Sequence, residues 1–161
     1  MDGTVWMLFS IGFPVLTGLL LLCVPCIRKR GAVVTVTAAG LVVTSLSVFA
    51  AVGAGEGTCT LLTLTEDVPV YFHMDGAGRL FASVVTIVWL CGGAFAFSYM
   101  KHEREEKRYF GCYLIVYGIL NGLDFSGNIV TFYMFYEFMT IMSFPLVLHT
   151  RSREAIMAGL K

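Results

Sequence analysis

Charged residues are scarce in this sequence. Only 14% of its 161 residues are Asp, Glu, Lys or Arg, whereas 57% are hydrophobic and the mean hydropathy is +0.79. A soluble domain of this length needs far more polar surface to stay dispersed, so the composition favours a membrane protein. Eleven basic and eleven acidic residues cancel to a formal charge of zero. The chain therefore lacks the basic field that would attract nucleic acid, and no nucleic-acid partner is expected.

Motifs for metals, redox pairs and nucleotides are also lacking. His73, His102 and His149 are widely separated and lie outside or at the edges of the apolar runs, so they do not form a metal cluster. Cys23 and Cys26 have CxxC spacing but no second pair or nearby histidine. Neither a phosphate-binding glycine loop nor a nucleophile with a base is present. We expect no metal, no cofactor and no catalytic site within the chain.

What the sequence has instead is long apolar runs. A hydrocarbon core of about 30 Å is crossed by about 20 helical residues. Runs of this order predict transmembrane helices at about 5–26, 32–52, 80–100, 109–123 and 129–148. They are expected to form a single all-α membrane domain over 1–161 in which Ser and Thr hydroxyls of the second helix bond to their own backbone. The extracytoplasmic loop 53–78 contains a β-prone stretch from Thr58 to Thr65 that favours a short hairpin.

The basic residues predict the orientation, because Lys and Arg near helix ends are retained in the cytoplasm. Bases follow the first, third and fifth predicted helices, whereas acids occupy the alternate segments with only Arg79 among them. Asp2 precedes the first apolar run and the bases follow it, an order that argues against a cleaved signal peptide. The prediction is a multi-pass inner-membrane protein with its N-terminus outside and the lipid bilayer as its surroundings.

Glu137 is the one ionisable residue deep within a predicted span. At about 1.5 Å per residue it lies about 13 Å from the start of its helix, near the bilayer midplane. An unpaired carboxylate there costs at least about 2.5 kcal/mol, so the side chain is expected to face protein, water or a cation. Desolvation favours the protonated form and a nearby cation favours the carboxylate, which suits proton transfer. The alternative is a neutral acid that only hydrogen-bonds between helices.

Four other features receive structural interpretations. Pro145 cannot donate to the carbonyl of Ile141, so a kink is as plausible as a straight helix. Gly118 and Gly122 form a GxxxG that predicts close helix packing. The mixed charge run at 101–108 is expected to be a solvated connection, and the segment 124–128 a tight polar turn.

The stretch from Met74 to Lys161 resembles the antiporter-like proton-translocating subunits of respiratory complex I, multisubunit sodium/proton antiporters and membrane-bound hydrogenases. The residues that carry the resemblance are Asp75-Gly76, Ser98-Tyr99-Met100, Asn128, Glu137, Ser143-Phe144-Pro145-Leu146 and Glu154-Ala155. The resemblance implies that Glu137 pairs with a lysine on a later helix and takes part in coupled proton transfer. It does not extend to the first two helices beyond their number, topology and lack of polar residues.

The family pattern continues well past this sequence, because its partner lysine would lie beyond Lys161. Residues 155–161 resemble the opening of a sixth helix, which suggests a truncated or split subunit completed by other membrane subunits. The leading hypothesis is a proton- or sodium-translocating subunit, or its N-terminal part, of a complex I-like, antiporter or hydrogenase assembly. A rival is a non-transporting scaffold that uses Glu137 as a helix contact. A third possibility is a helical subunit of a membrane enzyme whose cofactor lies elsewhere.

Overall fold

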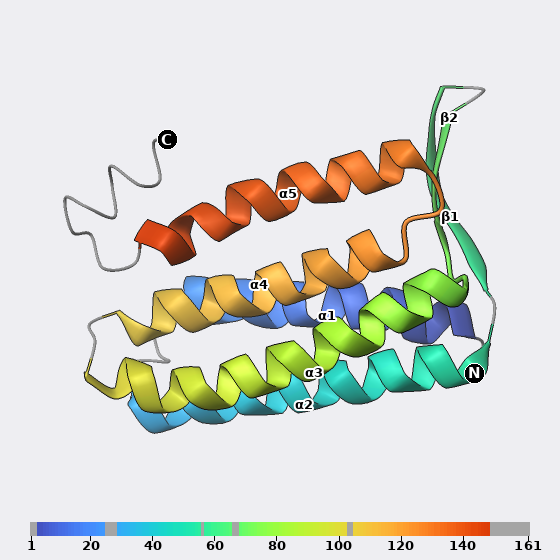
Figure 1. Cartoon of the computed structure of the whole chain (residues 1–161). Helices are drawn as coiled ribbons and strands as arrows, with labels where there is room; N and C mark the ends of the chain where they lie inside the picture. Colours follow the sequence, from blue (N-terminus) through green and yellow to red (C-terminus); the bar gives the residue numbers. More distant parts are fainter. Residues whose placement is uncertain (1–2, 25–28, 56, 66–67, 103–104, 149–161) are drawn as a thin grey trace.

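The structure, a computed structural model, describes residues 3–24, 29–55, 57–65, 68–102 and 105–148. These residues form a helical bundle with one β-hairpin across its end (Figure 1). The elements are α1 (Gly3–Cys23), α2 (Arg30–Ala54), β1 (Thr58–Thr65), β2 (Val68–His73), α3 (Gly76–Tyr99), the 3-10 helix η1 (Met100–His102), α4 (Glu106–Asp124) and α5 (Ile129–Val147). Each of the five predicted helices is present. Cys26 and the predicted sixth helix at 155–161 lie outside the described residues.

Four of the described helices, α1, α2, α3 and α5, are long and apolar enough to cross a membrane. The sequence also predicted a span at 109–123, but the corresponding helix α4, although 19 residues long, does not qualify by composition. It begins with Glu106, Lys107 and Arg108 and carries Asn121 and Asp124 near its end. The structure thus supports a multi-pass membrane protein, while the predicted five-span topology stays a prediction.

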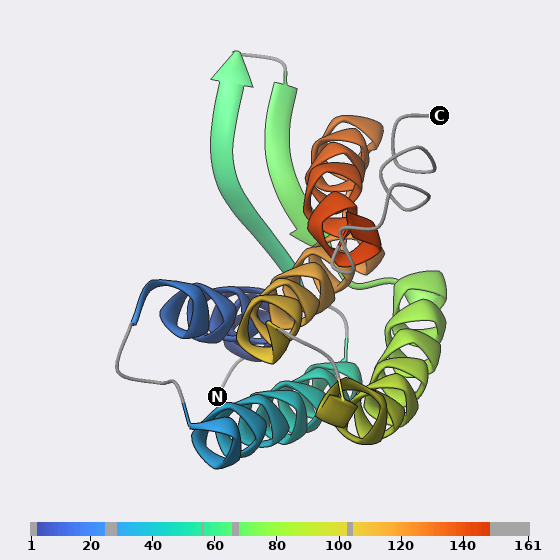
Figure 2. The same cartoon turned by 90° about the vertical axis from the view of Figure 1, so that its left-hand side faces the viewer.

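Helix α4 occupies the middle of the bundle, and α1, α2, α3 and α5 surround it (Figure 2). Close approach depends on the GxxxG pair. A Cβ at Gly118 would lie 2.6 Å from the Ile11 carbonyl oxygen of α1, and one at Gly122 would collide with the Phe135 ring of α5. The two glycines therefore let α4 pack against two neighbours at once, which confirms their interpretation as packing residues.

Two buried threonine hydroxyl groups in α2 donate hydrogen bonds to backbone carbonyls of the same helix. Thr37 donates to the Val33 carbonyl at 2.8 Å, and Thr44 donates to the Gly40 carbonyl at 2.7 Å. Both threonines are fully buried. This back-bonding removes most of the cost of placing a hydroxyl in an apolar surrounding, as the sequence predicted.

The hairpin pairs β1 with β2 in antiparallel register, with Cys59 opposite Phe72. It confirms the hairpin expected from the β-prone stretch and adds a small sheet to an otherwise helical fold. Strand β2 is fixed to the α4–α5 connection, because His73 N donates to the Phe125 carbonyl at 2.8 Å and Gly127 N donates to the Tyr71 carbonyl at 3.0 Å. The hairpin therefore sets where α5 begins.

Charge is divided between the two ends of the bundle. The end where α2 and α4 begin carries the described bases Lys29, Arg30, Lys101, Lys107 and Arg108. The hairpin end carries Asp75, Arg79 and Asp124. This separation agrees with the predicted grouping of charges.

Candidate functional site

The start of α5 is held by Asn128. Its Oδ1 accepts from the Thr131 amide at 2.8 Å and from the Thr131 hydroxyl at 2.7 Å. Its Nδ2 donates to the Pro69 carbonyl of β2 at 2.6 Å. Asn128 is therefore an N-cap that also connects α5 to the hairpin, and it fixes the register of every side chain that follows.

Glu137 is the ninth of nineteen residues in α5, which confirms its expected place in the middle of the helix. The helix continues past Pro145 to Val147. Glu137 is about 12 Å along the helix axis from the first residue of α5 at the usual helical rise. Glu137 is thus one residue from the midpoint of α5.

Glu137 lies on the face of α5 that points away from α4. Phe135 marks the opposite face, because its ring packs against Gly122 of α4 and against Phe72 of the hairpin with centroids 5.4 Å apart. Glu137 follows Phe135 by two residues, so its side chain is rotated by about 200° around the helix axis from that of Phe135. Ile141, one turn along on the Glu137 face, is 62% exposed. The described bundle therefore leaves the Glu137 face open.

Glu137 has few polar contacts with the described residues. It is half-buried, and it interacts with the Tyr133 side chain one turn earlier on the same face. No ion pair to Glu137 occurs within the described ranges; the recorded pairs join Arg30 to Glu106 and Arg108 to Glu105. The resemblance's partner lysine would lie beyond residue 161. The carboxyl group thus has a position suited to a partner but no cation within the described part of the chain.

A second polar cluster lies inside the bundle and was missed by the sequence reasoning. The Tyr117 hydroxyl of α4 lies 3.1 Å from Ser45 Oγ of α2 and 3.2 Å from Thr86 Oγ1 of α3. All three side chains are buried. The available signal was the four-residue spacing of Tyr113, Tyr117 and Asn121, which puts polar groups on one side of α4. The cluster joins three helices through hydroxyl groups and contains no strong acid or base.

The polar turn predicted at 124–128 is present as the connection between α4 and α5 over residues 125–128. Asp124 itself is the last residue of α4, just beyond the predicted span. Burial raises the pKa of its carboxyl group to about 7. Its Oδ2 is buried and has no hydrogen-bond partner among the described residues. Asp124 and Asp75 line one cavity of about 410 Å³ at the hairpin end.

Metal ligation is not supported by the described part of the chain. Within it, no three His, Cys, Asp or Glu side chains gather closely enough to hold an ion. His149 lies outside the described residues. The candidate site is therefore the single carboxyl of Glu137, with Tyr133 beside it.

Four apolar helices of spanning length indicate a multi-pass membrane protein. Residues 63–110 match the family described as NADH-ubiquinone oxidoreductase (complex I), chain 5 N-terminus. Within this segment the match confirms the resemblance seen in the sequence. The matched segment covers most of the hairpin, α3 and the beginning of α4 and ends before Glu137.

The curated relatives are components of cation/proton antiporters. The A/B subunit of a probable K(+)/H(+) antiporter from Rhizobium meliloti (strain 1021) is 32% identical over 75 residues, which are 47% of this chain and 8% of the relative. The A1 subunit of the Na(+)/H(+) antiporter from Staphylococcus aureus strains JH9 and Newman is 28% identical over 88 residues, 54% of this chain and 11% of the relative. The match thus spans about a tenth of these proteins and shows distant homology over that part.

Proposed function

We propose that the chain helps to translocate protons or sodium as a membrane subunit, or the N-terminal part of one, of a complex I-like, antiporter or hydrogenase assembly. Glu137 is the proton-carrying residue. The observation that carries the proposal is its place at the centre of α5, on the face that the described bundle leaves open. The antiporter relatives support the class of function but not the ion.

The physical argument starts from the cost of an acid in lipid. An ionised carboxylate at mid-membrane depth costs at least about 2.5 kcal/mol unless it has a partner, and such residues mark ion pathways. The buried hydroxyl groups of Thr37 and Tyr117 have hydrogen-bond partners inside the bundle. Glu137 has only Tyr133 beside it among the described residues. A further segment is therefore required to cover it.

A mechanism follows from the chemistry of one carboxyl group. With no cation nearby, the low-dielectric surrounding favours the neutral acid, which holds a proton on one carboxyl oxygen. When a protonated intramembrane lysine approaches, its charge favours the carboxylate, and Glu137 passes its proton to a water molecule on the pathway. Retreat of the lysine restores the acid, which takes up the next proton. We propose that another chain or a later segment supplies this lysine.

The test is ion translocation in vesicles that hold the full assembly, with wild type compared with Glu137→Gln. Glutamine keeps the size and hydrogen-bonding capacity but cannot release a proton. We expect loss of translocation at unchanged assembly, whereas Glu137→Asp should retain part of it. Thr140→Val is the matched control, because this hydroxyl lies less than one turn away and bonds only to the Tyr136 carbonyl at 3.0 Å.

The alternative, a non-transporting scaffold, has its own support in the exposed apolar side chains of α5. Under it, Glu137 is a polar contact to a partner helix. Unchanged translocation by Glu137→Gln, together with weaker co-purification of partner subunits, would favour the scaffold and end the translocation proposal. Loss of translocation with intact co-purification would exclude the scaffold.

A further inference from the structure

A cavity of about 390 Å³ lies at the basic end of the bundle, between the start of α2 and the end of α3. Its lining has two kinds of surface. Arg30, Gly31 and Ser98 give it a polar and cationic part, whereas Val34 and Phe97 give it an apolar part. The cavity lies far along the bundle from the hairpin end, so it is separate from the pocket of Asp75 and Asp124.

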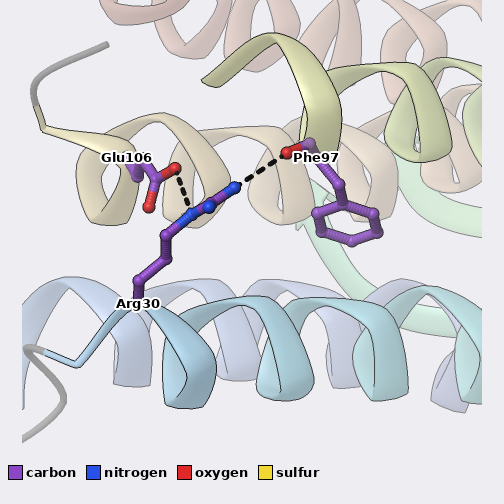
Figure 3. Close-up of polar contacts among 3 residues, drawn as sticks. All are labelled: Arg30, Phe97 and Glu106. Atoms are coloured by element: carbon purple, nitrogen blue, oxygen red, sulfur yellow. Dashed lines mark hydrogen bonds and ion pairs between the residues drawn. The ribbon is translucent and has the colours of Figure 1, made fainter. Parts of the chain in front are cut away.

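Arg30 is fixed in place at this cavity (Figure 3). Its Nε donates to Glu106 Oε1 at 2.8 Å, and its Nη2 donates to the Phe97 carbonyl at 3.1 Å. These two contacts tie α2 to α4 and to α3. A guanidinium group has five N–H donors, so three remain beyond these contacts. The side chain is 42% exposed, which leaves the remaining donors accessible to an anion.

The described basic residues around this cavity outnumber the acidic ones, which favours the binding of an anion. Glu106 is paired with Arg30, and Glu105 is paired with Arg108 at 3.1 Å. The described bases at this end also include Lys29, Lys101 and Lys107. Lys107 Nζ donates to the Val24 carbonyl at 2.7 Å, which is a neutral partner. The described residues at this end therefore carry an excess of positive charge.

The apolar part of the lining decides which anion fits. Val34 and Phe97 would gain nothing from a free phosphate ion, but they suit the first carbons of an acyl chain. Basic pockets between membrane helices are suited to anionic lipid headgroups.

We propose that the cavity between Arg30 and Ser98 binds the phosphodiester headgroup of an anionic phospholipid. The guanidinium of Arg30 donates to the phosphate oxygens, and the acyl chains run along the apolar surfaces of α2 and α3. Arg30 thereby links the lipid to three helices through Glu106 and the Phe97 carbonyl. The site would hold a lipid against the bundle whether or not the chain transports ions.

The test measures which lipids stay bound to the purified full chain. The chain is exchanged into detergent micelles with equal phosphatidylglycerol and phosphatidylcholine, and retained lipid is quantified by native mass spectrometry. We expect wild type to retain phosphatidylglycerol selectively. Arg30→Gln should lower that retention about fivefold, the factor that corresponds to one cation near an anionic lipid surface. A large excess of inorganic phosphate should not displace the lipid.

Two further variants distinguish lipid binding in the cavity from attraction by the overall positive charge at this end of the bundle. A Cβ at Gly31 would meet no atom within 4 Å, so Gly31→Leu can fill the cavity without displacing the backbone or changing any charge. We expect it to lower phosphatidylglycerol retention as much as Arg30→Gln does. Glu106→Gln breaks the same ion pair as Arg30→Gln but keeps the cation, so it should keep or raise retention.

Arg108→Gln removes one positive charge from the same end but outside the cavity lining, and it should change retention far less than Arg30→Gln. The proposal is overturned if Gly31→Leu retains the lipid as wild type does, or if Arg108→Gln matches Arg30→Gln, since either result means diffuse surface attraction. It is also overturned if inorganic phosphate competes fully, because the site would then bind the free ion. Equal losses in Arg30→Gln and Glu106→Gln would reduce Arg30 to a structural ion-pair residue.

Discussion

Two polar side chains of the bundle, those of Tyr117 and Glu137, differ in their partners. The Tyr117 hydroxyl has Ser45 on one side and Thr86 on the other, so its polarity is satisfied by the bundle itself. Glu137 is on the open face of α5, where the described residues offer it only Tyr133. A satisfied buried group stabilises its own fold, whereas an unsatisfied one at this depth requires a partner. The contrast makes Glu137 the functional candidate and Tyr117 a structural one.

Asp124 gives a prediction about pH and stability. Its pKa rises from an ordinary 3.8 to about 7 because burial disfavours the carboxylate. The folded state therefore keeps its proton to higher pH than the unfolded state does. The contribution of protonated Asp124 to the free energy of unfolding is full below pH 3.8, decreases as the pH rises toward 7 and stays low above pH 7. Asp124→Asn, which cannot ionise, should therefore unfold at a higher temperature than wild type at pH 8.

The same comparison at pH 4 is the internal control, because both side chains are then largely neutral in the folded state and the two midpoints should converge. A gain of about 1 kcal/mol corresponds to a midpoint shift of roughly 2–4 °C for a chain of this size. The measurement is thermal unfolding of the detergent-solubilised chain followed by circular dichroism. Equal midpoints at pH 8 would mean that Asp124 is hydrated in both states.

Glu137 was found from sequence, while the burial of Asp124 was not, and the reason is physical. A lone acid in an apolar run is visible without any tertiary information. Burial of Asp124 depends on the close approach of α3 and α4, where a Cβ at Gly78 would lie 2.7 Å from the Asp124 carbonyl oxygen. Gly78 is far away in the sequence, so no local pattern indicates this contact.

Among the elements, apolar runs predicted that each helix exists but not where it begins. Helix α3 begins at Gly76, four residues before its predicted start at 80, because Asp75 Oδ1 accepts from the Gly78 amide at 2.6 Å. Helix α4 likewise begins at Glu106, so part of the predicted connection at 101–108 is helical. Capping and tertiary contacts set helix ends, whereas hydropathy reports only the lipid-facing length.

Asn128 provides a prediction at the level of elements. Asn128→Ala removes the cap of α5 and the bond from Nδ2 to the Pro69 carbonyl at 2.6 Å together. Loss of an N-cap costs about 0.5–2 kcal/mol, and we expect a loss in the upper part of that range because the hairpin is also released. Hydrogen exchange should show faster exchange of the amides of Tyr71 and Thr131.

Asn128→Asp separates the two roles of the side chain. Aspartate keeps an oxygen that caps α5 but has no N–H to donate to Pro69. We expect the Thr131 amide to stay protected in this variant while the hairpin exchanges faster. Thr140→Ala, whose hydroxyl bonds only within α5, should leave both amides unchanged. Identical exchange in Asn128→Ala and wild type would show that packing alone holds the hairpin to α5.

At the scale of the whole molecule, the described bundle is asymmetric. Only 6% of the apolar window of α5 is buried, compared with 44% of that of α2. An outer helix in lipid needs no cover for apolar side chains, but α5 also carries Glu137 on its open face. The curated relatives are about ten times longer than the matched segment, so those proteins have further chain with which to cover such a face. The proposed function places the contact with other subunits at this open face of α5.

Cysteine labelling distinguishes this face from ordinary lipid-facing surface. Ile141 is 62% exposed on the Glu137 face of α5, and Leu46 is 64% exposed on α2, so the two positions form a matched pair. In a cysteine-free background, Ile141→Cys and Leu46→Cys should react equally with an apolar maleimide in the isolated chain. In the full assembly we expect Ile141→Cys to react roughly tenfold more slowly, because interface cores pack as densely as protein interiors. Leu46→Cys should keep its rate. Equal rates at the two positions in the assembly would mean that the Glu137 face of α5 contacts lipid. They would contradict the prediction that a protein partner covers this face.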